Sequence, residues 1–158
     1  MPKPGTSFED VFERLHLPQE ERHVSVSRAE GKFMHQWIRE HQLHATLEVG
    51  LGYGTSAACI MSAHSGAHTC IDPFQQDTYQ NAGLQNLEAL GYRDRVLFHA
   101  DFSHNVLPRL HAEKRKYDFI FIDGSHDFDS IFVDFYYANL LLSQNGYLLF
   151  HDAWMRST

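Results

Sequence analysis

The chain has 158 residues, of which 43% are hydrophobic and 13% aromatic, and it carries a formal net charge of −7. This is enough apolar material for the core of one compact domain. The negative charge and the scattered Lys and Arg residues exclude a basic stripe for a phosphate backbone, so we expect no nucleic-acid partner. No apolar run reaches the roughly 20 residues that span a bilayer, and the first residues lack the apolar core of a signal peptide. We therefore expect no membrane contact and a cytoplasmic location.

A helical cap is predicted over residues 1–44, in front of an α/β domain over residues 45–158. Thr6 or Ser7 is suited to cap a short first helix that runs through Leu15. A second helix, over residues 28–41, has apolar residues at helical spacing. That face must pack on another element, and the sheet is the expected partner.

From Ala45 onward, short β-rich runs alternate with helical segments. Strands are predicted over residues 46–49, 69–71, 96–99, 119–122 and 147–150, and helices over residues 55–63, 77–90, 103–110 and 128–142. Right-handed crossover helices of this length connect parallel strands. The fold class is therefore predicted as α/β, with a doubly wound parallel sheet that forms one compact unit with the N-terminal helices.

Two further features of these segments are predicted to be structural. The last helix has apolar residues at i, i+3 and i+4 intervals, which we interpret as core and not as a substrate contact: Phe128, Ile131, Phe132, Phe135 and Leu142. The two cysteines, Cys59 and Cys70, lie in apolar runs without C-x-x-C spacing, which predicts buried thiols.

A glycine-rich bend follows the first strand. The residues run Glu48-Val49-Gly50-Leu51-Gly52-Tyr53-Gly54-Thr55-Ser56. Glycines let a ligand come close to the backbone, and the next helix offers free N–H groups, although a plain tight turn is the alternative. A dinucleotide site would need G-x-G-x-x-G, but Thr55 stands three residues after Gly52, and the lysine of a P-loop is missing. Both nucleotide alternatives are weakened.

The glycine bend resembles the first motif of class I S-adenosylmethionine-dependent methyltransferases, E/D-x-G-x-G-x-G. Glu48, Gly50, Gly52 and Gly54 match it in full. The resemblance implies a Rossmann-like methyltransferase fold with strand order 3-2-1-4-5 and S-adenosylmethionine as the cofactor. It also implies that the bend, with Tyr53, Thr55 and Ser56, surrounds the methionine end of the cofactor, with Glu48 beneath it.

Acidic residues also follow the second and third strands, at the edge where ligands bind in such sheets. Asp72, with Phe74 close by, stands where the hydroxyls of a ribose would lie, although it is equally able to cap the next turn. In the family that the chain resembles, Asp101 would take the adenine amino group and Phe102 would cover the ring. Asp101 is alternatively the N-cap of the helix over residues 103–110.

The fourth strand delivers Asp123 and then His126 to the same edge, an arrangement that can bind a cation or move a proton. The run from Ile122 to His126, I-D-G-S-H, and the later pair His151-Asp152 resemble a bacterial subfamily related to catechol and caffeoyl-coenzyme A O-methyltransferases. The resemblance implies that Asp123 contacts the cofactor and binds a divalent metal together with His151 and Asp152. His126 would stand where relatives place a basic lysine.

The resemblance is incomplete at these positions, because imidazole replaces a carboxylate among the metal ligands. Hard cations such as Mg²⁺ prefer oxygen, so the change favours Mn, Fe or Zn. His126 is alternatively a helix-start residue bonded to the backbone, and His151 alternatively has a structural role.

The predicted reaction is the transfer of a methyl group to a hydroxyl of a small-molecule acceptor, of the catechol or sugar type by resemblance. Asp123 and His126 are the predicted catalytic residues. The rivals are a methyltransferase-like domain that only binds cofactor or protein and a nicotinamide-dependent oxidoreductase. Relatives add two strands after the fifth, whereas this chain stops at Thr158. We therefore expect either a homodimer through the exposed edge of the fifth strand or a fragment of a longer protein.

Overall fold

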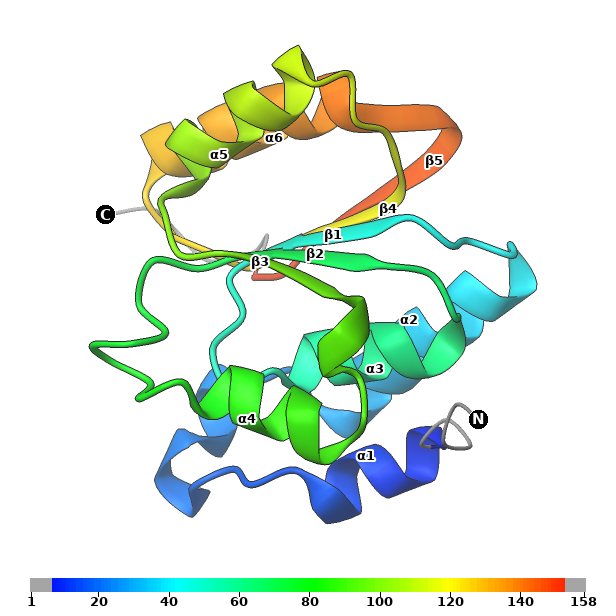
Figure 1. Ribbon diagram of the computed structural model, residues 1–158, viewed down its shortest axis with the longest axis vertical. Coiled ribbons are helices and arrows are strands. Elements are labelled where there is room, and N and C mark those ends of the chain that lie inside the picture. The colour runs from blue at the N-terminus through cyan, green and yellow to red at the C-terminus, as the bar shows by residue number, and fades with distance from the viewer. Residues whose placement is uncertain (1–6, 153–158) are drawn as a thin grey trace.

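The computed structural model describes residues 7–152, in which five parallel strands lie between two layers of helices (Figure 1). The strands are β1 (Thr46–Val49), β2 (His68–Ile71), β3 (Val96–His99), β4 (Tyr117–Ile122) and β5 (Leu142–Phe150). They pair in the order β3-β2-β1-β4-β5, all parallel. The predicted doubly wound fold and its strand order are confirmed.

The register of the central strands brings the candidate residues to one edge. Val49 at the end of β1 lies beside Ile71 of β2 and Ile122 of β4. Since all three strands run in the same direction, the residues that follow them emerge side by side. These are Gly50, Asp72 and Asp123.

Helices cover both faces of the sheet. They are α1 (Phe8–Arg14), α2 (Arg28–Glu40), α3 (Thr55–Ala63), α4 (Ala82–Ala89), α5 (Ser103–Ala112) and α6 (Phe128–Leu141), with short 3-10 turns η1 (Gln19–Val24) and η2 (Arg93–Arg95). In Figure 1, α1 to α4 lie on one face and α5 and α6 on the other. Ser7 and Ser27 cap α1 and α2 in complete capping boxes, which satisfy free N–H groups of the first turn.

The N-terminal helices pack on the rest of the molecule. Met34 and Ile38 of α2 share a buried cluster with Ile60 and with Phe119 and Phe121 of β4, as expected for a helix that packs on the sheet. The boundary at residue 44 stays a prediction. Among the described residues, no helix has both the length and the apolar character needed to cross a bilayer. Both cysteines are buried free thiols, as predicted.

Helix α4 is shorter than predicted. It begins at Ala82 and not at residue 77, because Gln80 and Asn81 adopt positive φ values of 51° and 62° that a helix does not contain. The preceding residues form turns that bring Gln75 against the glycine bend, where its amide donates to the carbonyl of Gly52 at 2.7 Å. Because the helix begins late, Gln75 from the preceding turns contacts the glycine bend.

The interpretation of α6 as a helix with a phenylalanine core face is wrong. Phe128, Phe132 and Phe135 are 66%, 58% and 47% exposed, while the buried residues of α6 are Asp134, Ala138 and Leu141. The helix is apolar on most of its sides, so residue spacing alone did not determine which side faces the sheet. Strand β5 lies at the edge of the sheet, and its pairing with another copy stays a prediction.

Candidate functional site

The glycine bend, residues 50–54, uses three left-handed glycines with φ values of 91°, 50° and 80°. A Cβ atom on Gly50 would lie 2.1 Å from the carbonyl oxygen of Asp123, and one on Gly54 would lie 3.0 Å from that of Gly83. A Cβ on Gly52 would meet only the Tyr79 ring, at 3.9 Å. The bend is therefore tightly packed at both ends and open over Gly52, where a ligand can approach the backbone.

Glu48, two residues before the bend, is fully buried, and its role toward the cofactor stays a prediction. Its Oε2 accepts a hydrogen bond from the Ser56 hydroxyl at 2.9 Å, and its Oε1 lies 3.5 Å from Nε2 of His68. Because Ser56 belongs to the first turn of α3, the carboxylate ties the end of β1 to the start of that helix. His68 was missed in the sequence, although it faces the same side of β2 as Cys70.

Asp72 faces the bend, but protein donors occupy its carboxylate. Oδ2 accepts from the N–H groups of Leu51 and Gly52, at 3.1 and 2.9 Å, and from Nε2 of Gln75 at 2.9 Å, while Oδ1 accepts from the Phe74 N–H at 2.8 Å. A carboxylate offers about four lone-pair positions. A ribose contact therefore requires one donor to give way, and Gln75 is the only side chain among these four. The ribose role stays a prediction.

Three buried polar atoms beside the bend have no hydrogen-bond partner among the described residues. They are Oε1 of Glu48, Oγ1 of Thr55, at the start of α3, and Oε1 of Gln75, whose residue is 1% exposed. Buried polar groups are almost always paired in folded proteins. These atoms, together with the open face of Gly52, fit a site for a polar ligand that lies on the bend.

The residues after β3 are held by their own helix. Asp101 accepts hydrogen bonds from Asn105 and Arg109, both at 2.9 Å, and the N-cap of α5 is Phe102, so the alternative of Asp101 as N-cap is wrong. Phe74 and Phe102 meet edge to face at 5.9 Å, and each is about half exposed. They provide an apolar surface near the bend, and the adenine contacts stay predictions. Tyr53 packs against Tyr79 at 5.3 Å.

Asp123, His151 and Asp152 meet where β4 and β5 end. Nδ1 of His151 is buried without a hydrogen-bond partner among the described residues and lies 3.1 Å from Oδ1 of Asp123 and 3.1 Å from Oδ2 of Asp152. Burial raises the pKa of Asp123 to about 6, with Asp152 adding to the shift and His151 opposing it. Burial lowers the pKa of His151, but the neighbouring carboxylates outweigh it and the net shift is upward.

His126 and Glu30 border this cluster from opposite sides. The His126 ring is 49% exposed, and its Nε2 lies 3.6 Å from Oδ2 of Asp152. Glu30, from the first turn of α2, reaches to 3.4 Å from Nε2 of His151. The structure thus places His151 beside both aspartates and His126 beside Asp152 alone, and Glu30 adds a carboxylate from the N-terminal helices.

A cavity of about 340 Å³ opens on this cluster. One end is polar, lined by Asp123, His126, His151 and Asp152, and the other is lined by the exposed face of α6 and by Phe150. The phenylalanines that we had interpreted as core therefore line one wall of this cavity: Phe128, Phe132 and Phe135.

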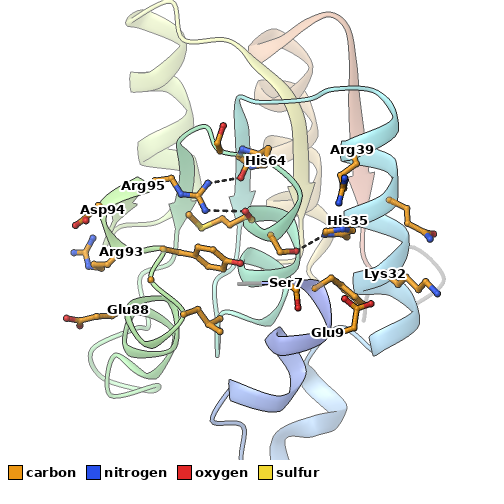
Figure 2. A pocket seen from close by; sticks show the side chains of 18 of the residues that line it. Ser7, Glu9, Lys32, His35, Arg39, His64, Glu88, Arg93, Asp94 and Arg95 are labelled. Atoms are coloured by element: carbon orange, nitrogen blue, oxygen red, sulfur yellow. Dashed lines mark hydrogen bonds between the residues drawn. The ribbon is translucent and has the colours of Figure 1, made fainter. Parts of the chain in front are cut away.

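A second, wider hollow of about 1500 Å³ lies away from the strand ends, between α1, α2 and the segment around η2 (Figure 2). Its charged residues have both signs, and Arg95 donates to the carbonyl oxygens of Met61, His64 and Gly66 at 3.2, 2.8 and 3.2 Å. Because the Arg95 guanidinium is used to hold the backbone, we place the chemistry at the strand ends and not here.

Asp134 is a buried carboxylate behind Gly124, and it gives a pH-dependent prediction. Burial raises its pKa to about 6 from the ordinary 3.8, opposed by a hydrogen bond from Ser103. A raised pKa means that ionisation opposes folding, so its contribution to stability falls as the pH rises from about 4 through about 6. We expect Asp134→Asn to be more stable than the wild type by about 2 kcal/mol at about pH 7.5, and by less at about pH 4.5. Urea denaturation at both pH values tests this, with exposed Asp129→Asn as the control that should show no such pH-dependent gain.

Comparison with known proteins identifies this architecture. A family model described as "Methyltransferase domain" matches residues 47–153. An O-methyltransferase from Bacillus cereus, solved with S-adenosylhomocysteine, is 22% identical with a TM-score of 0.73, covering 92% of this chain and 66% of its own. The O-methyltransferase TomG from Streptomyces achromogenes, solved with S-adenosylmethionine, is 20% identical with a TM-score of 0.74, covering 94% and 66%.

A methyltransferase from Podospora anserina, solved with S-adenosylhomocysteine, is 22% identical with a TM-score of 0.70, covering 90% of this chain and 58% of its own. The chain thus spans just under two thirds of the length of the first two structures. These likenesses establish the fold. No curated protein matches the sequence.

Proposed function

Because the chain belongs to the methyltransferase domain family, we propose that it transfers the methyl group of S-adenosylmethionine to a hydroxyl of a small molecule. The observation that carries the proposal is the contact between Gly50 and Asp123. The glycine bend packs directly on the backbone of the residue that begins the polar cluster, so a ligand on the bend would lie beside that cluster.

The cofactor is proposed to lie over Gly52, with its polar groups toward Thr55 and Gln75. When bound, S-adenosylmethionine supplies a methyl group on a positively charged sulfur, which a hydroxyl oxygen can attack in line. The buried carboxylates of Glu48 and Asp72 make the bend a favourable place for a positively charged ligand. Solved structures that hold this cofactor or its product share the fold.

The acceptor is proposed to enter the cavity of about 340 Å³, with its hydroxyl toward Asp123 and His126. The aromatic wall of Phe128, Phe132 and Phe135 favours a flat, apolar molecule of the catechol type over a sugar. Holding the two reactants in line supplies most of the rate enhancement, on the order of 7–11 kcal/mol for well-oriented reactions.

The hydroxyl proton is proposed to pass to His126, which borders the cavity, or to Asp123, whose pKa of about 6 lies close to the working range of a general base. Asp123, His151 and Asp152 place three ligand atoms within 4.8 Å of one another. With one nitrogen and two oxygen donors and an unpartnered Nδ1 on His151, they fit a divalent cation of the Mn, Fe or Zn type. Such a cation would lower the cost of removing the hydroxyl proton.

Calorimetric titration with S-adenosylmethionine, S-adenosylhomocysteine and NAD tests the first step. We expect binding of the two adenosyl compounds and none of NAD; binding of NAD alone would support the oxidoreductase rival. Methyl transfer to a set of catechols, measured with and without a chelator, then separates an enzyme from a domain that only binds the cofactor. Binding without transfer to any acceptor would favour the binding-only alternative.

A further inference from the structure

A chain of buried and partly buried polar side chains runs from the far end of the sheet to the glycine bend. The Gly66 N–H donates to Nδ1 of His64 at 3.0 Å, and Nε2 of His64 lies 3.1 Å from Oγ1 of Thr46. Thr46 Oγ1 lies 2.8 Å from Nδ1 of His68, whose Nε2 lies 3.5 Å from Oε1 of Glu48. Thr46, His68 and Glu48 are fully buried. The chain joins β1, β2 and the loop after α3.

The donor and the acceptor at each step of this chain follow from the protonation of His64, the member farthest from the glycine bend. Burial lowers the pKa of His64 to about 3, so its ring is neutral and carries one ring proton. Because Nδ1 accepts from Gly66, that proton is on Nε2 and points to Thr46. The Thr46 hydroxyl can then donate to Nδ1 of His68, which leaves the His68 proton on Nε2, facing Glu48. In this order, the Nε2–H of His68 faces Oε1 of Glu48 across 3.5 Å, which is longer than a normal hydrogen bond, and neither atom has a hydrogen-bond partner among the described residues.

The outer end of the chain is held in place. Figure 2 shows His64 beside Arg95, whose guanidinium donates to the His64 carbonyl at 2.8 Å and to the Gly66 carbonyl at 3.2 Å. Arg95 also lies over the Tyr92 ring, 5.0 Å from its centre. The loop that supplies the first donor is thus fixed, and the orientation of the His64 ring with it.

We propose that His68 is a positioning residue for the cofactor site, which directs its Nε2–H to Glu48 and so holds that carboxylate beneath the glycine bend. The inference rests on the proposed function, because it assigns the bend to the cofactor. Glu48 accepts a hydrogen bond from Ser56 of α3 on Oε2, while its Oε1 has no hydrogen-bond partner among the described residues and lies 3.5 Å from Nε2 of His68 in β2. Without His68, this buried oxygen would lose the polar neighbour that His68 supplies, and the link between the end of β1 and the start of α3 would loosen.

Two variants of His68 test the role of the side chain. His68→Leu removes both ring nitrogens, and we expect it to weaken the binding of S-adenosylhomocysteine about tenfold, because an apolar side chain would then face the buried charge of Glu48. His68→Gln can still accept from Thr46 and donate to Glu48, so we expect it to keep the affinity within about threefold. Equal affinities of His68→Leu and the wild type would overturn the inference.

Thr46→Val tests the chain without touching His68 or Glu48. Its matched control is Thr69→Val, the same change on a buried residue of β2 whose hydroxyl bonds to Tyr117 on the other face, at 3.2 Å. Thr46→Val loses two hydrogen bonds and Thr69→Val loses one, so we expect both variants to lose thermal stability and Thr46→Val to lose more. Only Thr46→Val should weaken the binding of S-adenosylhomocysteine, by about threefold to tenfold. If both variants, or neither, lower the affinity, the chain has only a structural role.

Nitrogen-15 NMR of the histidine rings reads the proposed proton positions directly. We expect His68 in the wild type to carry a proton on Nε2 and none on Nδ1, and a proton on Nδ1 would overturn the assignment. Glu48, His68 and Cys70 also place three ligand atoms within 4.8 Å, so metal analysis of the purified protein is the companion measurement. A stoichiometric transition metal that is lost in His68→Leu would contradict the hydrogen-bond chain.

The two proposals fail in different ways. If the wild type binds neither S-adenosylmethionine nor S-adenosylhomocysteine, the proposed function is wrong, and the positioning role falls with it. If the wild type binds them and His68→Leu binds them equally well, only the positioning role is wrong. Should His68→Leu not fold, Thr46→Val with its control decides the question.

Discussion

Gly50→Ala is expected to destabilise the fold by about 3–5 kcal/mol and to abolish the binding of S-adenosylmethionine. Two physical effects add. The φ of 91° at Gly50 is unfavourable for a residue with a side chain, and the new Cβ would lie 2.1 Å from the carbonyl oxygen of Asp123 and 2.8 Å from its carbon. Both atoms are backbone at the end of β4, so the contact cannot be relieved by turning a side chain. Urea denaturation measures the loss of stability, and calorimetry measures the binding.

Gly91→Ala is the control for this prediction. Gly91 has a similar φ of 81°, but a Cβ there would have nothing within 4 Å. It should therefore show only the conformational cost, about 1 kcal/mol, with cofactor affinity unchanged. Losses of the same size in Gly50→Ala and Gly91→Ala would mean that the packing of the bend on Asp123 adds nothing. The model of adjacent cofactor and polar sites would then lose its main support.

Asp123→Asn is expected to lower the rate of methyl transfer about 100-fold or more while changing cofactor affinity less than about threefold. The side chain faces His151 at 3.1 Å and lines the acceptor cavity, so its charge acts on the acceptor and on any bound cation. Burial raises the pKa of Asp123 to about 6, so removing the charge should not destabilise the fold at about pH 8. A rate loss with unchanged or higher stability would therefore separate a chemical role from unfolding.

Asp127→Asn is the matched control on the same loop. Asp127 is exposed and caps α6 by accepting the Ser130 N–H at 3.0 Å, which an asparagine can also do, so activity should stay at the wild-type level. Chelator treatment of the wild type supplies the second comparison. Activity that falls with chelator and returns with Mn²⁺ would support the cation site. Activity that resists chelator but is lost in Asp123→Asn would leave proton transfer as the role of this residue.

Much of the architecture could be predicted from local pattern. The strands over residues 46–49 and 96–99 and the helix over residues 55–63 match the structure residue for residue. Short apolar runs with glycine at their ends, separated by helical segments, admit few arrangements other than a parallel sheet with crossover helices. The order of the strands came from the resemblance of the glycine motif and not from periodicity.

Local pattern could not predict which face of a helix packs on the sheet or which side chains meet at the site. Phe132 of α6 was predicted to lie in the core, but it is exposed. The prediction was wrong because the sequence of a helix that is apolar on most sides does not show which side faces the sheet. His126 was predicted as a catalytic residue, and only the structure shows that its ring is 49% exposed and that its Nε2 lies 3.6 Å from Asp152. The donors that occupy Asp72 include Gln75, which no spacing rule singles out.

The sequence by itself determined which segments form strands and helices and which strand ends carry acidic and glycine residues, since these depend on neighbours along the chain. Only the tertiary structure decided that Glu48 meets His68 and that Glu30 reaches His151. The physical reason is that such contacts join residues on different elements, and their distances depend on how helices and strands pack in three dimensions. Periodicity shows which residues share a face, and packing decides what that face touches.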